Sequence, residues 1–177
     1  MSIYPEQYSP VFNPIKDLNI ERILDGVSLA TTQFPTGLGE VNSLQIEFGA
    51  GVVTPQASLS SLGAITINET GTYRVKISLI FGRTSNPNTS RLRFRALVNG
   101  VQAGLTIGAT VPNANSSTPY TDEAWLSLPA GTVITYEVMR DSSGSDEGGL
   151  VLPTVTAATA PSWNQAATAA IRIERWK

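Results

Sequence analysis

The chain of 177 residues contains neither cysteine nor histidine. Without cysteine it has no disulfide framework, no thiolate nucleophile and no sulfur-ligated zinc site. Without histidine it also lacks the side chain that enzymes use most often as a general base. We therefore expect a protein that is not an enzyme, with no catalytic residues, no metal site and no cofactor.

Carboxylates are the remaining source of acid–base chemistry, and neighbouring pairs occur at Asp122-Glu123 and Asp146-Glu147. Neighbouring residues of a strand face opposite ways, so the first pair cannot converge on one substrate. The second pair lies in the Gly/Ser-rich loop 141–149, which would not hold the fixed separation that carboxylate catalysis needs. With Asp141, this loop could supply oxygen ligands to calcium, but the spacing matches no loop with defined ligand positions. A solvated acidic loop is the alternative.

Charged residues are also scarce, at 15% of the chain against roughly 25% in typical soluble domains. The net charge of -2 provides no general positive field, so neither nucleic acid nor an anionic membrane is expected as a partner. No run of about 18 apolar residues occurs, and the N-terminus lacks the basic and apolar regions of a signal peptide. We expect synthesis in a cytoplasm without secretion.

Residues 1–38 differ from the rest because they are rich in proline and show no sustained alternation of apolar and polar residues. Such a segment cannot bury its own large side chains, which predicts an N-terminal arm that docks on another protein. The docking residues would be Tyr4, Tyr8, Phe12, Ile15 and Phe34. The alternative is an arm that folds back on its own domain. The mixed apolar spacing of residues 17–29 also permits a short helix ending at Gly26.

From residue 41 apolar and polar residues alternate with period two, which is typical of strands with one buried face. We expect about eight strands, around residues 44–48, 65–67, 73–81, 92–98, 101–107, 124–128, 134–138 and 169–176. Asn99-Gly100 predicts a tight hairpin. The pattern indicates an all-β, antiparallel jelly-roll β-sandwich over residues 39–177, with the last strand inside a sheet.

Large apolar side chains are left over when the inward positions of these strands are filled. They are Ile80, Leu97, Trp125, Val133, Met139 and Trp176. Several of them on one sheet would form a patch too large for a monomer, and burial against identical subunits would stabilise the assembly by about 25 cal/mol per Å². We expect a threefold interface with Trp125 or Trp176 near its axis. A register error of one residue would exchange the two faces.

Half of the basic residues fall between positions 74 and 95, and on adjacent strands they would form one outward basic face. The candidate face consists of Arg74, Lys76, Arg91, Arg93 and Arg95, with Arg83 between them in the sequence. Three interpretations remain open. The cations pair with Glu137 or Glu174 on neighbouring strands, contact an acidic partner, or bind an anionic glycan.

Four segments carry a family resemblance by their order and spacing: residues 71–75 (GTYRV), 98–100 (VNG), 126–134 (LSLPAGTVI) and 170–175 (AIRIER). Across roughly residues 41–177 they resemble the jelly-roll superfamily of the complement globular head and tumour necrosis factor. The last strand departs from the family pattern, which expects F-x-G-x-L where this chain has AAIRI at 169–173. Without a collagen repeat, membrane anchor or signal peptide, the chain is most similar to the bacteriophage branch of capsid decoration, head-fibre and tail-fibre-tip proteins.

That resemblance implies a homotrimer whose N-terminal arm grips a particle. We therefore expect a phage virion structural protein, a capsid decoration or cement protein, with the major capsid protein or another virion protein as its partner. The alternative is a receptor-recognition module of a head fibre or tail fibre that binds bacterial surface glycans through loops 83–90, 108–119 and 141–168. A third function, a cytokine-like ligand, is disfavoured by the missing secretion signal.

Overall fold

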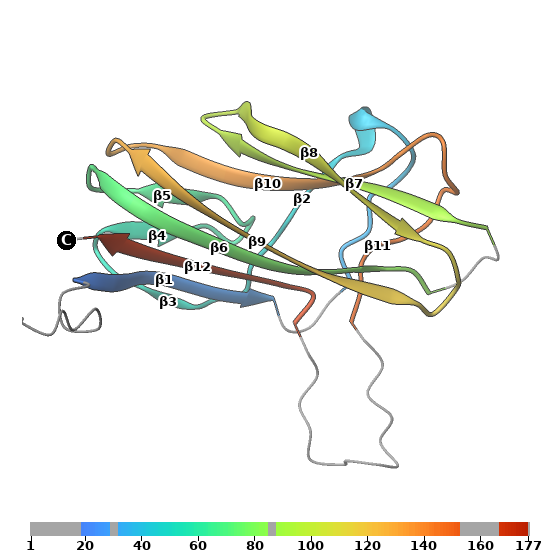
Figure 1. Ribbon diagram of the computed structural model, residues 1–177, viewed down its shortest axis with the longest axis horizontal. Helices are drawn as coiled ribbons and strands as arrows, with labels where there is room; N and C mark the ends of the chain where they lie inside the picture. Colours follow the sequence, from blue (N-terminus) through green and yellow to red (C-terminus); the bar gives the residue numbers. More distant parts are fainter. Residues whose placement is uncertain (1–18, 29–31, 85–87, 153–166, 177) are drawn as a thin grey trace, which may run out of the picture.

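The computed structural model describes residues 19–28, 32–84, 88–152 and 167–176, which form two packed antiparallel sheets (Figure 1). Sheet A runs β9 (Ser117–Leu128), β6 (Gly71–Gly82), β12 (Ala169–Trp176), β1 (Ile20–Ser28) and β3 (Val52–Val53), and β11 (Gly149–Leu150) pairs with the end of β6. Sheet B runs β8 (Val101–Val111), β7 (Ser90–Val98), β10 (Val133–Arg140), β5 (Ile65–Ile67) and β4 (Ala57–Leu59), and β2 (Leu44–Gln45) also pairs with β10. A 3-10 turn, η1, covers Glu40–Asn42.

The all-β sandwich predicted from the sequence is confirmed. Each of the expected strands is present, although the first is reduced to the two residues of β2. The structure adds β1, β3, β4 and β11. The C-terminal strand β12 lies between β6 and β1, inside sheet A as expected. The Asn99-Gly100 hairpin is also confirmed, because both residues have the positive φ, 51° and 78°, that a type I′ turn requires.

The core lies between the sheets and follows the period-two pattern. Alternate residues of β6 from Tyr73 to Phe81 are buried, and they face the buried side chains of β7 and β10. At the centre, Phe94 stacks on Tyr136 with ring centroids 5.7 Å apart, and it also contacts the rings of Phe81 and Tyr120. Aromatic rings from both sheets therefore hold the sandwich together.

The expected helix near residues 17–29 is wrong, because residues 20–28 form strand β1 along the full length of β12. A β-bulge between Arg22 and Leu24 explains the misleading pattern. The extra residue breaks the period-two alternation, so the adjacent residues Ile23 and Leu24 are both 0% exposed. The resulting irregular spacing in the sequence imitates one face of a helix.

The boundary of the N-terminal arm at residue 38 is therefore wrong as well. β1 is part of sheet A, and the Gln33 side chain bonds both the amide and the carbonyl of Glu47, at 2.7 and 3.0 Å. Phe34, expected to dock on a particle, instead lies 5.8 Å from the Arg140 guanidinium of its own domain. Strand β1, Gln33 and Phe34 therefore fold back on their own domain, which was the alternative to docking on another protein. Tyr4, Tyr8, Phe12 and Ile15 lie outside the described residues.

Candidate assembly surfaces

Two tryptophans meet on the outer face of sheet A. Trp125 of β9 lies opposite Arg74 of β6, and its ring is 5.6 Å from the ring of Trp176, the last residue of β12. They are 46% and 49% exposed. Arg74 lies 6.0 Å from the Trp125 ring and pairs with Glu123 and Glu174, at 2.7 and 3.2 Å. This arrangement holds an apolar pair in contact with solvent.

All six predicted interface residues point outward, as the alternation indicated, but they do not share one face. Ile80, Trp125 and Trp176 belong to sheet A, whereas Leu97, Val133 and Met139 belong to sheet B. The six therefore form no single patch, and three of them lie on each sheet. Alternation distinguishes inward from outward side chains, but it does not say to which sheet a strand belongs.

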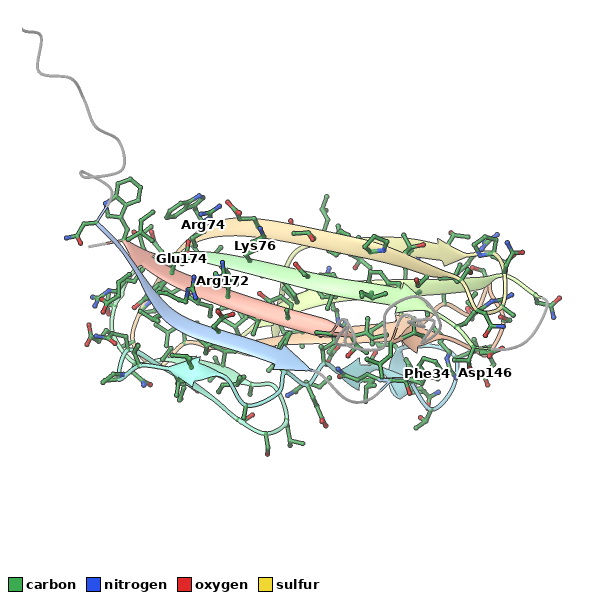
Figure 2. All side chains as sticks on the ribbon, turned by 90° about the horizontal axis from the view of Figure 1, so that it is seen from below. Phe34, Arg74, Lys76, Asp146, Arg172 and Glu174 are labelled. Atoms are coloured by element: carbon green, nitrogen blue, oxygen red, sulfur yellow. The ribbon has the colours of Figure 1, made fainter. Side chains whose placement is uncertain are left out.

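The single basic face is wrong for the same reason. Arg74 and Lys76 lie on β6 of sheet A, whereas Arg91, Arg93 and Arg95 lie on β7 of sheet B (Figure 2 labels the first two). Arg83 is buried at 1% exposure. Arg74, Arg93 and Arg95 are each paired with carboxylates, so these arginines form no broad anion-binding surface.

Cross-strand pairing, one of the three interpretations of the basic residues, is what the structure shows for Arg74 and Arg95. Arg74 bonds Glu174, and Arg95 bonds Glu137 and Glu40 at 2.7 and 2.8 Å. The hydrogen bonds that Arg95 donates to Glu137 and Glu40 raise the pKa of Arg95, and the hydrogen bond that Arg74 donates to Glu123 lowers the pKa of Glu123. Exposed pairs of this kind contribute little to stability.

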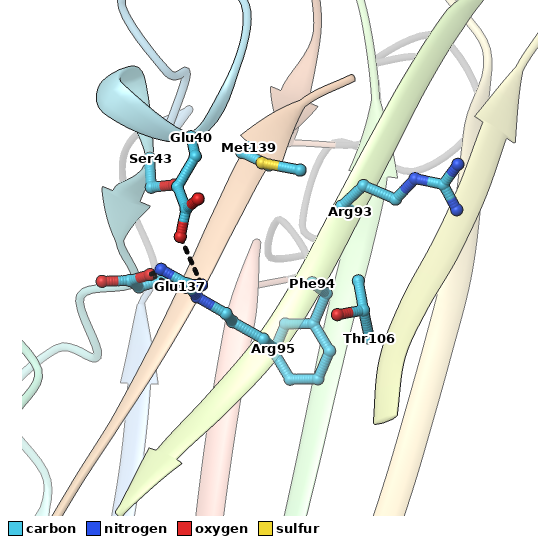
Figure 3. A pocket seen from close by; sticks show the side chains of 8 residues that line it. All are labelled: Glu40, Ser43, Arg93, Phe94, Arg95, Thr106, Glu137 and Met139. Atoms are coloured by element: carbon cyan, nitrogen blue, oxygen red, sulfur yellow. Dashed lines mark hydrogen bonds and ion pairs between the residues drawn. The ribbon is translucent and has the colours of Figure 1, made fainter. Parts of the chain in front are cut away.

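A hollow of about 220 Å³ opens on sheet B beside Arg95 (Figure 3). It is lined by Glu40, Ser43, Arg93, Phe94, Arg95, Thr106, Glu137 and Met139. The two arginines of the lining, Arg93 and Arg95, are balanced in charge by its two glutamates, Glu40 and Glu137. Its floor therefore offers hydrogen-bonding groups without a net charge.

The acidic loop 141–149 uses its aspartates in ion pairs. Asp141 lies 2.7 Å from Arg93 and accepts hydrogen bonds from the Ser143 backbone and hydroxyl, which lower the pKa of Asp141 to about 2. Asp146 lies 2.9 Å from Arg140, whose Nε donates to the Gly148 carbonyl. Within the described ranges, no three acidic, histidine or cysteine side chains gather to hold a metal ion.

One flank of the sandwich, between the edge strands β8 and β9, is open. A groove of about 340 Å³ runs along it and is lined by inner side chains of both sheets, including Val75, Phe94, Leu126 and Tyr136. Leu105 of β8, at the groove, is 85% exposed. The sequence predicted that Ala124 and Leu126 point inward, and they do, but it could not show that nothing in the described protomer covers them.

Asp122 places a carboxylate in this apolar flank. It lies opposite Ile77, so its side chain is on the inner face of sheet A, whereas Glu123 points outward to Arg74. The expectation that the two carboxylates diverge is confirmed. Burial, followed by the charge of Asp122, raises the pKa of Tyr136, and the same causes together with a hydrogen bond to Asp122 raise the pKa of Tyr120. The carboxylate therefore faces the aromatic core.

Tyr136 makes the fold sensitive to alkali. The folded chain keeps the phenol proton that an unfolded chain releases near its usual pKa of about 10. Stability is therefore full below about pH 10 and falls as the pH rises, by up to about 1.4 kcal/mol per pH unit. We expect urea unfolding to show this slope, and Tyr136→Phe to reduce it. An unchanged slope in Tyr136→Phe would contradict the buried phenol.

Three loops meet at the end of the sandwich where β6 terminates. The buried Arg83 guanidinium donates to the Pro112 carbonyl at 3.1 Å and lies 3.4 and 3.5 Å from the hydroxyls of Ser90 and Ser145. A hollow of about 220 Å³ beside it is lined by Arg83, Thr84, Asn115, Ser116, Ser117, Val151 and Leu152. The described chain starts at the opposite end, where Ile20 pairs with Trp176 (Figure 1).

Comparisons with known proteins identify the fold. No family model and no curated protein matches the chain. The globular domain of zebrafish complement 1qA matches with a TM-score of 0.52 at 13% identity, over 88% of this chain and 97% of that chain. The tumour necrosis factor Eiger of S. frugiperda matches with 0.53 at 13% identity, over 88% and 93%.

A third match is murine APRIL at pH 5.0, with a TM-score of 0.51 at 13% identity, over 87% of this chain and 98% of that chain. The described part of the chain contains no helix with the length and hydrophobicity needed to cross a bilayer. At such identities the likeness to these solved structures concerns the fold. The chain therefore has an all-β, two-sheet antiparallel jelly-roll fold like that of the complement and tumour necrosis factor heads, as the sequence resemblance implied.

Proposed function

We propose that this chain is a homotrimeric structural head of a bacteriophage virion, a capsid decoration or cement protein attached through its N-terminal segment. The observation that carries the proposal is the contact between Trp125 and Trp176, half-exposed on sheet A beside the open β8–β9 flank. Large adjoining apolar surfaces mark association sites. Subunit contacts would cover both of them.

The open flank and the outer face of sheet A are two different surfaces, and a ring of identical copies can pack one against the other. The flank exposes the inner side chains of β8 and β9, and the outer face of sheet A begins on the other side of β9. Packing the flank of one copy on sheet A of the next is a heterologous contact, and such contacts form closed rings when the rotation allows it. Three copies is the number that the family resemblance implies.

The polarity of the sandwich supports attachment and display. Residue 19, the first that the structure describes, leads into β1 at the end where the tryptophans lie. The loops around Arg83 lie at the other end of β6. A segment that precedes residue 19 can therefore bind a particle while these loops face away from it. Major capsid protein or another virion protein would be the partner.

A receptor-recognition module of a head or tail fibre is the second candidate. It is favoured by the convergence of residues 83–84, 88–90, 112–116 and 141–149 at one end, where the Ser145 amide bonds the Thr89 carbonyl at 2.9 Å. Loops on a rigid scaffold commonly carry recognition. Binding of the isolated protein to bacterial cells or surface polysaccharide, without binding to particles, would favour this candidate over a cement protein.

Replacing Trp125 by serine is expected to weaken the trimer at least about 30-fold, because buried tryptophans are frequent hot spots of interfaces. Light scattering after size-exclusion chromatography should give three times the 18.8 kDa protomer mass for the natural chain. The variant should dissociate at micromolar concentration. Val41→Ser, which changes another exposed apolar side chain on η1, is the control and should remain trimeric.

Particle binding tests the role itself. The purified chain should co-sediment with virions from which it has been removed, and it should saturate at a fixed copy number. A natural chain that is monomeric at micromolar concentration would contradict the assembly. A trimer that binds no particle would contradict the cement role and leave the assembly intact.

A further inference from the structure

We propose that Asp122 in the flank of one copy forms an ion pair with Lys76 on sheet A of the neighbouring copy, and that this pair sets how the copies dock. The inference rests on the proposed homotrimer and deepens it by naming a contact. It follows from two charges that have no ion pair among the described residues and lie on the two surfaces that the proposal brings together.

The first charge is Asp122. Its inward position on the edge strand β9 puts a carboxylate among Val75, Ile77 and Tyr136, which line the same groove. Its side chain accepts a hydrogen bond from the neighbouring Glu123 amide, at 2.9 Å, and its hydrogen bond with Tyr120 helps to raise the pKa of that phenol. In the described part of the chain no cation lies within ion-pair distance of it. Closing the groove with apolar groups alone would desolvate an unpaired charge, which is strongly unfavourable. The surface that covers the groove must therefore carry a cation.

The second charge is Lys76, in the middle of the outer face of sheet A. It lies opposite Glu123 on β9 and Arg172 on β12, but Glu123 bonds Arg74, and no carboxylate within the described ranges is in ion-pair distance of the lysine. A hollow of about 210 Å³ adjoins it, lined by Asp25, Lys76, Ser78, Ala170, Ile171 and Arg172. Figure 2 labels Lys76 and Arg172 of this set. The hollow leaves room for a side chain from another copy.

The charge balance of the two surfaces is complementary. The outward positions of sheet A carry four cations, Arg22, Arg74, Lys76 and Arg172, and three carboxylates, Asp25, Glu123 and Glu174. The carboxylates are all engaged with arginines. The surplus cation is Lys76, and the flank carries the unmatched carboxylate of Asp122. Opposite charges on facing surfaces favour one docking orientation over others.

The shapes of the two surfaces also fit. Leu105 projects from β8 at the flank, and the hollow around Lys76 is recessed between β6, β12 and β1. Leu105 would bury apolar surface against the neighbouring copy, whereas the ion pair would fix the position of one copy relative to the other. A second copy of this chain is therefore the occupant that would both cover the exposed leucine and bring a cation to the Asp122 carboxylate.

Charge exchange tests the pair. Asp122→Lys and Lys76→Glu alone should each weaken the trimer about 30-fold or more, because each leaves like charges facing across the interface. The double variant Asp122→Lys/Lys76→Glu should recover most of the lost affinity. Sedimentation equilibrium gives the dissociation constants, and circular dichroism checks that each protomer is folded. Glu47→Lys makes the same charge change at an exposed carboxylate outside the groove and the hollow and should leave assembly unchanged.

The outcomes separate this inference from the proposed function. A monomeric natural chain overturns both. A trimeric natural chain whose single variants assemble normally overturns the ion pair alone, and so does a double variant no better than the worse single variant. If Asp122→Lys does not fold, Asp122→Asn combined with Lys76→Gln provides the second test. The double change should then cost less affinity than the two single changes added together.

Discussion

A chain that begins at residue 29 is expected to lose its folded head, whereas a chain that begins at residue 19 is expected to keep it. Removal of β1 takes Ile23 and Leu24 from the core and exposes the full edge of β12. Burial of the two side chains contributes about 1.5–3 kcal/mol each. Together with the exposed strand edge, the loss approaches the roughly 5–15 kcal/mol that stabilises a domain.

The two truncations are a matched pair. Circular dichroism and urea unfolding should show a cooperative transition for residues 19–177 and none for residues 29–177. The first truncation should also fail to co-sediment with particles, since the proposal assigns attachment to the segment before β1. Folding without β1 would contradict the placement of that strand, and particle binding without residues 1–18 would contradict the attachment mode.

Much of the fold could be predicted because burial imposes a periodicity that can be read locally. The alternation from Tyr73 to Phe81 correctly separated inward from outward residues, and the outward direction of Trp125 and Trp176 followed from it. The Asn99-Gly100 turn was predictable because few residues adopt positive φ. In both cases the local structure is determined by a few residues that are neighbours in the sequence.

The rest depended on contacts between distant residues. β6 and β7 follow each other in the chain but lie in different sheets, so Arg74 and Arg93 occupy opposite faces of the sandwich. The open flank arises because β8 and β9 end their sheets on the same side, and no local pattern encodes that. At β1 the bulge concealed the strand itself. The sequence marks Asp122 only as a poor catalytic candidate. Its position in an apolar groove cannot be predicted locally, because the surrounding side chains come from other strands.

Phe94→Ala is expected to lower the free energy of unfolding by about 3–5 kcal/mol, the largest loss of stability expected from any single substitution proposed for this chain. Phe94 is 3% exposed, and its ring meets Tyr136, Phe81 and Tyr120, which come from both sheets. Neighbouring rings of this size cannot collapse into the void without disturbing one another, so the cavity remains and its contacts are lost. Phe94→Leu keeps most of the volume and should cost much less.

The measurement is the free energy of unfolding in urea at one fixed protomer concentration, because dissociation of a trimer makes apparent stability depend on concentration. Val41→Ala, at a side chain that is 95% exposed, serves as the control and should stay within about 0.5 kcal/mol of the natural chain. A loss below about 1.5 kcal/mol for Phe94→Ala would mean that the two sheets do not share this aromatic centre. Because the same ring also lines the flank groove, a cavity there should loosen the assembly surface as well, and dissociation of the trimer should begin at lower urea than in Phe94→Leu.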